Sequence, residues 1–330
     1  MRAVRFHAHG GFDRLVVDEV PEPEPGEGEV VVRVVAAGVS PLDDKVRAGV
    51  LPDSMLKELP LVPGATAVGE VVDAGASSWA TGDRVLITGW GFGTTRDGLW
   101  RERVAVAADS LVALPDGVDD HTAAAMAAGS GYLTAYLSLT ELAPVRPGAR
   151  LLSPGYAGAV AMATVDLARV LGAGTVISTA RGEERATRAR ESGLAHIIDP
   201  STEDLRDEVR RLTDGHGVDV VVDGVGGPLT GDLVASLAPR GTLVAVGYTA
   251  GTTATFEITH LIWKTAQIKG FLFTLFSPER IRAANERLLE LVAGKQIAPM
   301  VAEVFPLERA AEAQRHVVED QPFGRVLLAP

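Results

Sequence analysis

Hydrophobic and polar residues follow two different patterns along this chain. Up to about residue 120, short runs rich in Val and Ala, such as VVVRVVAAGV and DRVLITG, are separated by Gly, Pro and Asp. This pattern predicts a barrel-like domain of short strands. A nearly all-apolar helix is then predicted over TAAAMAAGSGYLTAYLSLTEL, and strand and helix patterns alternate after it. Such alternation predicts a parallel, doubly wound sheet, so the fold class is α/β.

The alternating part of the chain predicts individual strands and helices. A capped helix is expected between Ser277 at its N-cap and Gly294 just beyond its end. The C-terminal FGRVLLAP is strand-like and is expected to return to the first domain. The other expected elements are strands at TVISTA, HIID, VDVVVDGVGG, TLVAVG and IKGFLF, and helices after Gly182, over residues 202–212 and over residues 229–237.

Length, charge and composition exclude several classes of protein. At 330 residues the chain is long for one core, which favours two domains. Its formal net charge of −12 opposes nucleic-acid binding. No segment has the apolar length of a membrane helix, and MRAVRF resembles a strand more than a signal sequence, so we expect a cytoplasmic protein. The absence of cysteine excludes disulfides, thiolate zinc sites and cysteine nucleophiles.

The segment over residues 150–185 is the most informative. A strand runs into Gly155, Gly158 and Ala161 at GxxGxxA spacing. The helix that follows has an apolar face formed by Val160, Ala163, Leu167 and Val170. Such a turn brings backbone amides at a helix N-terminus close to phosphate groups. The segment therefore predicts a dinucleotide site whose turn residues are Gly155, Tyr156, Ala157, Gly158, Ala159 and Val160.

The second strand of this segment indicates which dinucleotide is bound. About 20 residues beyond the glycines, an NAD site normally places an acid against the ribose, but this strand ends in STAR, without an acid. Arg181 can pair with the additional phosphate of NADP, and Arg185 follows one helical turn later. We therefore expect NADP(H), bound by Thr179, Arg181 and Arg185. Alternatively, the two arginines form an ordinary solvated helix start beside Glu183 and Glu184.

Several segments together resemble the medium-chain dehydrogenase/reductase superfamily, in its quinone oxidoreductase-like branch, which also holds enoyl reductases and acrylyl-CoA reductases. They are AAGVSPLDDKVRAG, LPLVPGATAVGEVVDAG, TGDRVL, GYLTAYLSL, SPGYAGAVA and GVDVVVDGVGG. The resemblance covers the whole chain, and the loop GWGFGTTRDGLWRERVAV is similar to acrylyl-CoA reductases. It implies a GroES-like β-barrel catalytic domain over residues 1–121, a Rossmann NADP-binding domain over residues 122–274 and a return to the catalytic domain over residues 275–330.

The resemblance also implies an assembly and further cofactor contacts. Relatives commonly pair as homodimers through a sheet edge, which is expected here near residues 242–247 or 268–273 because an exposed apolar edge invites pairing. Gly247, Phe271, Phe273 and Arg325 are expected to contact the cofactor.

The chain departs from the zinc-dependent alcohol dehydrogenases of the same superfamily. Ser40 occupies the position of their first zinc cysteine, and Gly64, Ala65 and Thr66 replace their Gly-His-Glu motif. Because these residues are poor zinc ligands, we expect no catalytic metal. Hydrogen bonds must then stabilise developing negative charge, which suits a conjugated acceptor that spreads this charge into an enolate.

The candidate catalytic residues are Ser40, Thr134 and Tyr132. The resemblance places Thr134 beneath the nicotinamide, and it places Ser40 where related enzymes usually carry Asn. Ser40 is expected to hydrogen-bond either the carboxamide or the substrate carbonyl. Asp43 is expected to fix its loop, and Lys45 either is solvated or delivers a proton. Tyr132 either donates the proton or is a buried helix residue whose hydroxyl is already bonded.

The sequence thus predicts an NADPH-dependent reductase of an activated carbon–carbon double bond or of a quinone, acting on a small molecule. Two alternatives stay open: a zinc-free ketone reductase of secondary metabolism, and an NADPH-binding protein with little turnover, similar to lens crystallins related to quinone oxidoreductases. The aromatic residues either line an apolar substrate pocket or belong to the core; they are Trp90, Phe92, Trp100, Trp263, Phe271 and Phe273.

Overall fold

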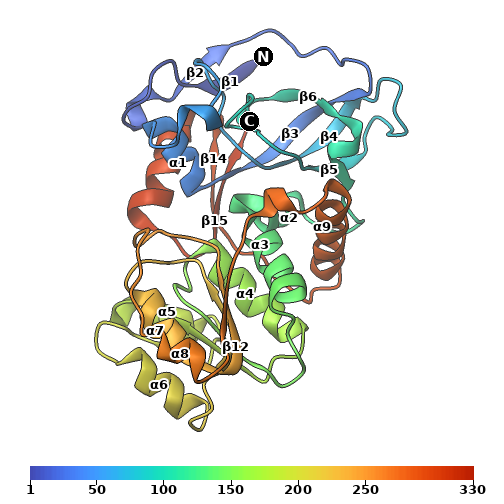
Figure 1. Ribbon diagram of the computed structural model, residues 1–330. Helices are drawn as coiled ribbons and strands as arrows, with labels where there is room; N and C mark the ends of the chain where they lie inside the picture. The colour runs from blue at the N-terminus through green and yellow to red at the C-terminus, as the bar shows by residue number, and fades with distance from the viewer. The chain divides into compact units, whose positions relative to one another are not determined.

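The computed structural model describes residues 1–330 and divides the chain into two compact units. Unit 1 comprises Met1–Ser130 and Ser277–Pro330, and unit 2 comprises Gly131–Phe276 (Figure 1). The expected domain boundaries, at residues 121/122 and 274/275, lie close to these divisions. Helix α2 (Asp120–Ala127) falls in unit 1 because it packs against the barrel strands β3 (Glu29–Val39) and β4 (Ala67–Asp73).

Unit 1 is built around a seven-stranded sheet. Its strands pair in the order β14-β15-β3-β4-β5-β7, and β6 pairs with β3, while β1 and β2 form a separate antiparallel pair. The expected C-terminal strand is confirmed, since β15 returns to lie antiparallel to β3 with Val326 opposite Val39. The remaining elements are β1 (Arg2–Arg5), β2 (Val16–Glu19), β5 (Arg84–Ile87), β6 (Arg103–Ala107), β7 (Leu111–Ala113), β14 (Val301–Pro306), β15 (Arg325–Ala329), α1 (Pro41–Ala48), α9 (Pro278–Ala293) and α10 (Ala310–Arg315).

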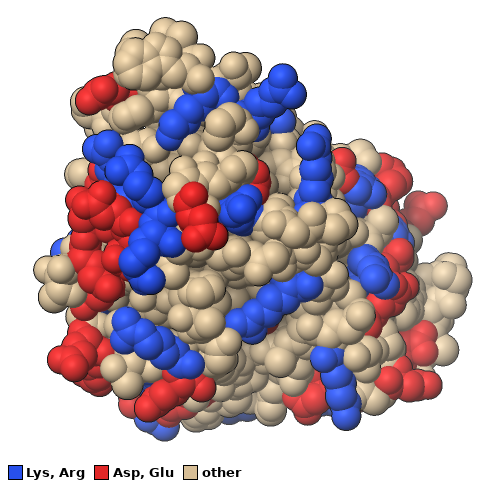
Figure 2. Space-filling view, turned by 90° about the horizontal axis from the view of Figure 1, so that it is seen from below, with Lys and Arg blue, Asp and Glu red and all other residues tan.

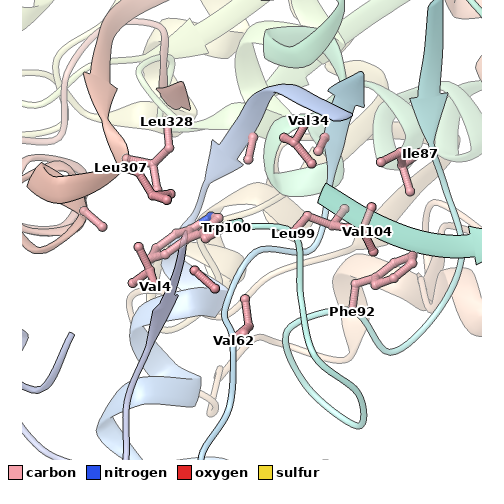
Figure 3. Close-up of a cluster of buried hydrophobic side chains, with 14 of the residues drawn as sticks. Val4, Val34, Val62, Ile87, Phe92, Leu99, Trp100, Val104, Leu307 and Leu328 are labelled. Atoms are coloured by element: carbon pink, nitrogen blue, oxygen red, sulfur yellow. The ribbon is translucent and has the colours of Figure 1, made fainter. Parts of the chain in front are cut away.

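The core of unit 1 is centred on Trp100, whose side chain is completely buried (Figure 3). Aliphatic residues such as Val4, Val62 and Leu328 belong to the same cluster. Phe92 is also a member of this cluster. Of the two alternatives for Phe92 and Trp100, the structure therefore supports membership of the core, where large aromatic rings are removed from water.

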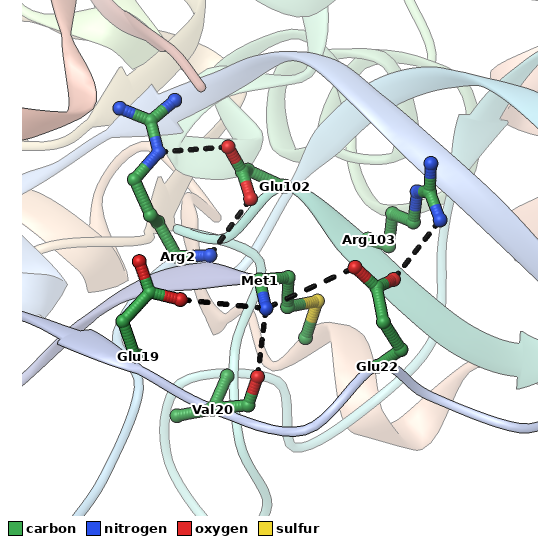
Figure 4. Close-up of polar contacts among 7 residues, drawn as sticks. All are labelled: Met1, Arg2, Glu19, Val20, Glu22, Glu102 and Arg103. Carbon is green, nitrogen blue, oxygen red and sulfur yellow. Dashed lines mark hydrogen bonds and ion pairs between the residues drawn. The ribbon is translucent and has the colours of Figure 1, made fainter.

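The N-terminus is fixed to the barrel by polar contacts (Figure 4). The Met1 ammonium donates to the Val20 carbonyl oxygen at 2.8 Å. Arg2 donates from its amide and its Nε to the two carboxylate oxygens of Glu102, at 2.7 and 2.8 Å. These contacts hold β1 against the segment that carries Trp100, and the Val4 amide donates to the Trp100 carbonyl oxygen at 2.9 Å.

Unit 2 is a parallel, doubly wound sheet, as predicted. Its six strands pair in the order β10-β9-β8-β11-β12-β13, and every pairing is parallel. The strands are β8 (Arg150–Ser153), β9 (Thr175–Thr179), β10 (His196–Ile198), β11 (Val218–Asp223), β12 (Leu237–Ala245) and β13 (Gln267–Gly270). The helices are α3 (Gly131–Leu137), α4 (Ala159–Val170), α5 (Glu183–Glu191), α6 (Leu205–Leu212), α7 (Leu229–Ala235) and α8 (Thr259–Ile262).

Position within the sheet corrects one prediction about its edge. Strand β12 lies between β11 and β13, so residues 242–247 do not form an exposed edge. Strand β13 ends the sheet on this side, and Ile268 on it is 39% exposed. Only the second of the two predicted pairing segments is therefore available.

The single apolar helix predicted after residue 121 is in fact broken. Helix α2 ends at Ala127, and Gly129 and Ser130 follow with φ of 65° and 52°. Two successive left-handed residues cannot continue a right-handed helix, so α3 starts anew at Gly131. Hydrophobicity alone did not reveal this break, because both helices are apolar.

Other helix limits follow local chemistry. Helix α9 is capped as predicted, with the Ser277 hydroxyl accepting from the Arg280 amide. Helix α6 begins at Leu205, later than predicted, because Asp204 caps it by accepting from the Arg206 and Asp207 amides.

No helix has the length and apolar character needed to cross a membrane. On the face seen in Figure 2, basic and acidic side chains are interspersed.

Candidate active site

The glycine turn lies between β8 and α4 and is fastened to the end of β9. Gly155 has φ of 77°, a left-handed conformation that favours glycine. Its amide donates to Oγ1 of Thr179 at 3.0 Å, and the Tyr156 amide donates to the Thr179 carbonyl oxygen at 2.9 Å. The predicted residue Thr179 therefore holds the turn in shape from the neighbouring strand.

The N-terminus of α4 offers backbone N–H donors at the point where the strand order of the sheet changes direction. Gly158 is the N-cap, and no side chain caps the helix. The Met162 amide donates to the Gly158 carbonyl oxygen, so the amides of Ala159, Val160 and Ala161 precede the first intrahelical bond. Strand β8 lies between β9 and β11, at the switch point where doubly wound sheets bind ligands. The turn therefore fits the pyrophosphate of a dinucleotide.

The side chains along the turn and α4 mostly pack within unit 2. Tyr156 is buried, and its hydroxyl oxygen accepts from Ser192 Oγ at 3.1 Å. On α4, Ala163 and Leu167 are fully buried as predicted, whereas Val160 and Val170 are half-buried. The groups through which the turn can bind a ligand are therefore those of its backbone.

The loops after β11 and β12 approach closely at the same edge of the sheet. Asp223 accepts at 2.9 Å from the amides of both Val225 and Gly226, which fixes the GVGG loop. A Cβ added at Gly247 would lie 2.4 Å from the Gly224 carbonyl oxygen. The predicted residue Gly247 is thus required for this close backbone approach.

The ends of β9 and β10 are joined by Asp199, a residue that sequence reasoning missed. Its Oδ1 accepts from the Gly182 amide at 3.0 Å and from the Ser201 hydroxyl at 2.6 Å. These hydrogen bonds, led by that from Ser201 and helped by the positive charge of Arg181, lower the pKa of Asp199. Arg181 itself is exposed. The acid that ends HIID is the sequence signal for this residue, and it comes one strand later than the acid of an NAD site normally does.

A cavity of about 280 Å³ adjoins this connection. It lies between α5 and the turn that follows β10, and polar side chains dominate its wall. The lining residues are Glu183, Ala186, Arg190, Asp199, Ser201, Thr202 and Glu203.

In unit 1, Ser40, Asp43 and Gly64 form a compact polar cluster. Ser40 is the N-cap of α1, and both its amide and its hydroxyl donate to Oδ2 of Asp43, at 2.8 and 2.7 Å. The Gly64 amide donates to Oδ1 of Asp43 at 3.0 Å. Burial raises the pKa of Asp43 to about 6, although these hydrogen bonds act in the opposite direction. The expectation that Asp43 fixes its loop agrees with these contacts.

Trp100 supports this cluster from the core. Its Nε1 donates to the Gly38 carbonyl oxygen at 3.0 Å, two residues before Ser40. Gly64 has φ of 98°, and a Cβ added there would lie 2.3 Å from Trp100 Cδ1. The tryptophan therefore fits against the backbone of both segments that form the cluster.

The remaining candidate residues are distributed over both units. Thr134 is buried on α3, and Tyr132 on the same helix donates its hydroxyl proton to Asp166 Oδ2 at 2.6 Å. Lys45 is half-buried on α1, and the Arg325 amide at the start of β15 donates to the Met300 carbonyl oxygen. Their catalytic or cofactor-binding roles stay predictions.

The aromatic candidates of unit 2 lie towards its surface. Trp263 is 81% exposed. Phe271 and Phe273 are half-buried, and the ring of Phe271 packs against that of Phe276 with centroids 5.7 Å apart. Trp263 is therefore not part of an enclosed pocket within unit 2.

Comparison with known proteins identifies the family to which the chain belongs. The family model of the alcohol dehydrogenase GroES-like domain matches residues 26–116, and the model of the zinc-binding dehydrogenase matches residues 159–290. The 2-haloacrylate reductase of a Burkholderia species is 32% identical over 341 residues, which cover 99% of this chain and 98% of the relative. The chain belongs to the medium-chain dehydrogenase/reductase family, in its quinone oxidoreductase-like branch. It is therefore an oxidoreductase.

Solved members of the medium-chain dehydrogenase/reductase family have the same fold. The Escherichia coli quinone oxidoreductase complexed with NADPH matches with a TM-score of 0.86 and 27% identity, and each chain is covered completely. An NAD-dependent alcohol dehydrogenase matches with a TM-score of 0.88 and 32% identity over 100% of both chains. Unit 1 thus contains the GroES-like fold and unit 2 the Rossmann fold, as predicted, and the cofactor is of the nicotinamide type.

Proposed function

We propose that this protein is an NADPH-dependent reductase of conjugated acceptors: enones, enoyl thioesters or quinones. The observation that carries the proposal is the Ser40 cluster, in which the serine hydroxyl lies beside the buried carboxyl group of Asp43. When that carboxyl group is protonated, the serine hydroxyl can donate to the oxygen of an enolate or of a hydroquinone anion, over which the negative charge is spread. The names of two relatives, a 2-haloacrylate reductase and an E. coli quinone oxidoreductase, support the same acceptor classes.

The cofactor proposed is NADPH, which supplies hydride to the acceptor when it is bound. The amides of Ala159 and Val160 at the start of α4 would bind its pyrophosphate. Arg181 and Arg185 would bind the phosphate on its adenosine ribose, since guanidinium groups pair strongly with phosphate. Among the solved relatives both cofactors occur, so the arginines are the features that favour NADPH here.

We propose that catalysis proceeds without zinc. Ser40, Ala65 and Thr66 offer at most hydroxyl groups in place of thiolate and imidazole, so these residues do not fit a catalytic zinc ion. Thr134 and Ser40 are proposed as the residues that contact the nicotinamide and the acceptor. Tyr132 is a weaker candidate because its proton is already donated to Asp166.

The protein is also proposed to form a homodimer through β13. Several apolar side chains of the segment that contains α8 and β13 are exposed, an unusual arrangement for a sheet edge in contact with water. They are Tyr248, Ile258, Ile262, Trp263, Ile268, Leu272 and Leu275. A second copy pairing along this edge would cover these side chains.

A panel of acceptors tests the proposed function. Purified protein is incubated with NADPH and cyclohexenone, a crotonyl thioester, benzoquinone or cyclohexanone while the absorbance of NADPH is followed. The proposal expects turnover of at least one conjugated acceptor and little turnover of cyclohexanone, by metal-free protein as judged by elemental analysis. Turnover of cyclohexanone alone, or activity that is lost with stoichiometric zinc on chelation, would contradict it.

A further inference from the structure

Asp43 is a buried carboxyl group without a cationic partner. Its side chain is 2% exposed, and the hydrogen bonds that it accepts come from Ser40 and Gly64. A carboxylate in such a place is costly unless a cation offsets its charge. Buried titratable groups of this kind gather at functional sites.

The charged groups around α1 are engaged with other partners. On α1 itself, the Arg47 guanidinium pairs with Asp44 and donates to the Gln314 amide oxygen at 2.5 Å. On α10 and the turn after it, Arg315 lies over the ring of Phe12, and His316 contacts Asp320 at 2.7 Å.

Two further charged groups belong to the elements around this cluster. Lys45 is half-buried on α1. Arg101, which follows Trp100, interacts with the charges of Asp97 and Arg96. The causes that set the pKa of Asp43 are burial and hydrogen bonds, and a neighbouring charge is not among them. The ionisation of Asp43 is therefore controlled within its own cluster.

The hydroxyl of Ser40 has one proton, and its direction depends on the state of Asp43. When Asp43 is ionised, the Ser40 hydroxyl donates to Oδ2 at 2.7 Å and can only accept hydrogen bonds from other groups. When Asp43 is protonated, its own O–H donates to Ser40 Oγ, which frees the serine proton to point elsewhere. Because burial raises the pKa of Asp43 to about 6, both states are accessible near neutral pH.

We propose that Ser40 and Asp43 act together as the proton donor to the oxygen of the reduced acceptor, with Asp43 acting through Ser40. This inference rests on the proposed function. A bound nicotinamide cofactor would supply hydride to the β-carbon of an enone, and the electron pair of the double bond would move to the carbonyl oxygen. That oxygen takes the Ser40 proton, and Ser40 takes the proton of Asp43. The products are an enol, which becomes the ketone in water, and an Asp43 carboxylate, which solvent reprotonates.

The first test measures the protonation of Asp43 without cofactor or acceptor. Carbon NMR of protein labelled at Asp carboxyl carbons, assigned by comparison with Asp43→Asn, follows the chemical shift from pH 4 to pH 8. The proposal expects a midpoint well above the ordinary value of about 4 for Asp. It also expects that Ser40→Ala, which removes one hydrogen bond to the carboxylate, shifts the midpoint upward. A midpoint at or below the ordinary value overturns the proposal.

The second test measures the pH dependence of kcat/KM for cyclohexenone with NADPH. Above the Asp43 midpoint, the wild type should lose about tenfold in kcat/KM per pH unit. Ser40→Ala and Asp43→Asn should lose about 10²-fold at low pH and show no such limb, because neither can deliver the proton. Asp53→Asn, at an exposed carboxylate of unit 1, should retain the wild-type profile.

The outcomes separate this inference from the proposed function. Circular dichroism and melting temperatures first establish that the variants are folded. If folded Ser40→Ala keeps the wild-type pH limb and rate, the proton comes from elsewhere and this inference fails, while the reductase function stands. If no acceptor in the panel is reduced, the proposed function fails and the inference fails with it.

Discussion

At the residue scale, the parts of the candidate site that could be predicted are those with a local signal. The glycine spacing predicted the turn at Gly155, and the resemblance singled out Ser40 and Asp43, which the structure brings together. Asp199 was missed because its contact with the Gly182 amide depends on the pairing of β9 with β10. The position of Trp100 was left open because sequence does not distinguish an aromatic residue in a pocket from one in the core, and the structure places it in the core.

Arg181→Ala is predicted to weaken NADPH binding much more than NADH binding. Loss of a charge-assisted contact to the ribose phosphate should cost about 1.5–3 kcal/mol. Fluorescence titration of both cofactors measures the effect, and Arg210→Ala, at an exposed position on α6, is the control. An Arg181→Ala variant that binds NADPH as tightly as the wild type, or a wild type that prefers NADH, would refute the assignment.

At the scale of elements, hydrophobic period and capping residues predicted most helices and strands. The prediction of Ser277 as the N-cap was confirmed, because its hydroxyl alone satisfies a free amide at the start of α9. The break between α2 and α3 was not predicted, because it depends on left-handed backbone at Gly129 and Ser130 within an apolar run. At other positions, close packing determines which residue type fits. The clearest example is Gly64, which packs against Trp100.

Gly64→Ala is predicted to destabilise unit 1 strongly. The new Cβ would meet Trp100 Cδ1 at 2.3 Å while the residue stays at φ of 98°. Overpacking and backbone strain together should cost on the order of 3 kcal/mol. Gly82→Ala is the matched control, since Gly82 has φ of 96° and nothing within 4 Å of an added Cβ. The free energy of unfolding is measured in urea. Equal losses for the two variants would show that the contact with Trp100 is not the reason why position 64 requires glycine.

At the scale of the whole molecule, one edge of the sheet of unit 2 is β13, and exposed apolar side chains are frequent around that edge. The sequence predicted pairing at an edge but named two segments, because strand order is not encoded locally. Because β12 pairs with β13 in a parallel ladder, β13 is the one of these two segments that lies at an edge of the sheet.

Replacing exposed apolar residues near β13 is predicted to produce monomers. The double variant Ile262→Glu and Trp263→Glu places charges at positions that are 64% and 81% exposed, which should oppose burial between two copies. Multi-angle light scattering at micromolar concentration measures the mass. Val50→Glu, at a 66% exposed position in unit 1, should leave the mass unchanged. A wild type that is already monomeric would contradict the homodimer.

The most direct measurement of the central claim is where the transferred hydrogen arrives. Protein is incubated with cyclohexenone and NADPH that carries deuterium at the transferred position, and the product is analysed by mass spectrometry and NMR. A site that offers hydrogen bonds instead of a metal should favour delocalised charge. The account therefore predicts deuterium at the β-carbon of cyclohexanone and solvent hydrogen at the α-carbon. Deuterium at the carbinol carbon of an allylic alcohol, with the double bond intact, would contradict it.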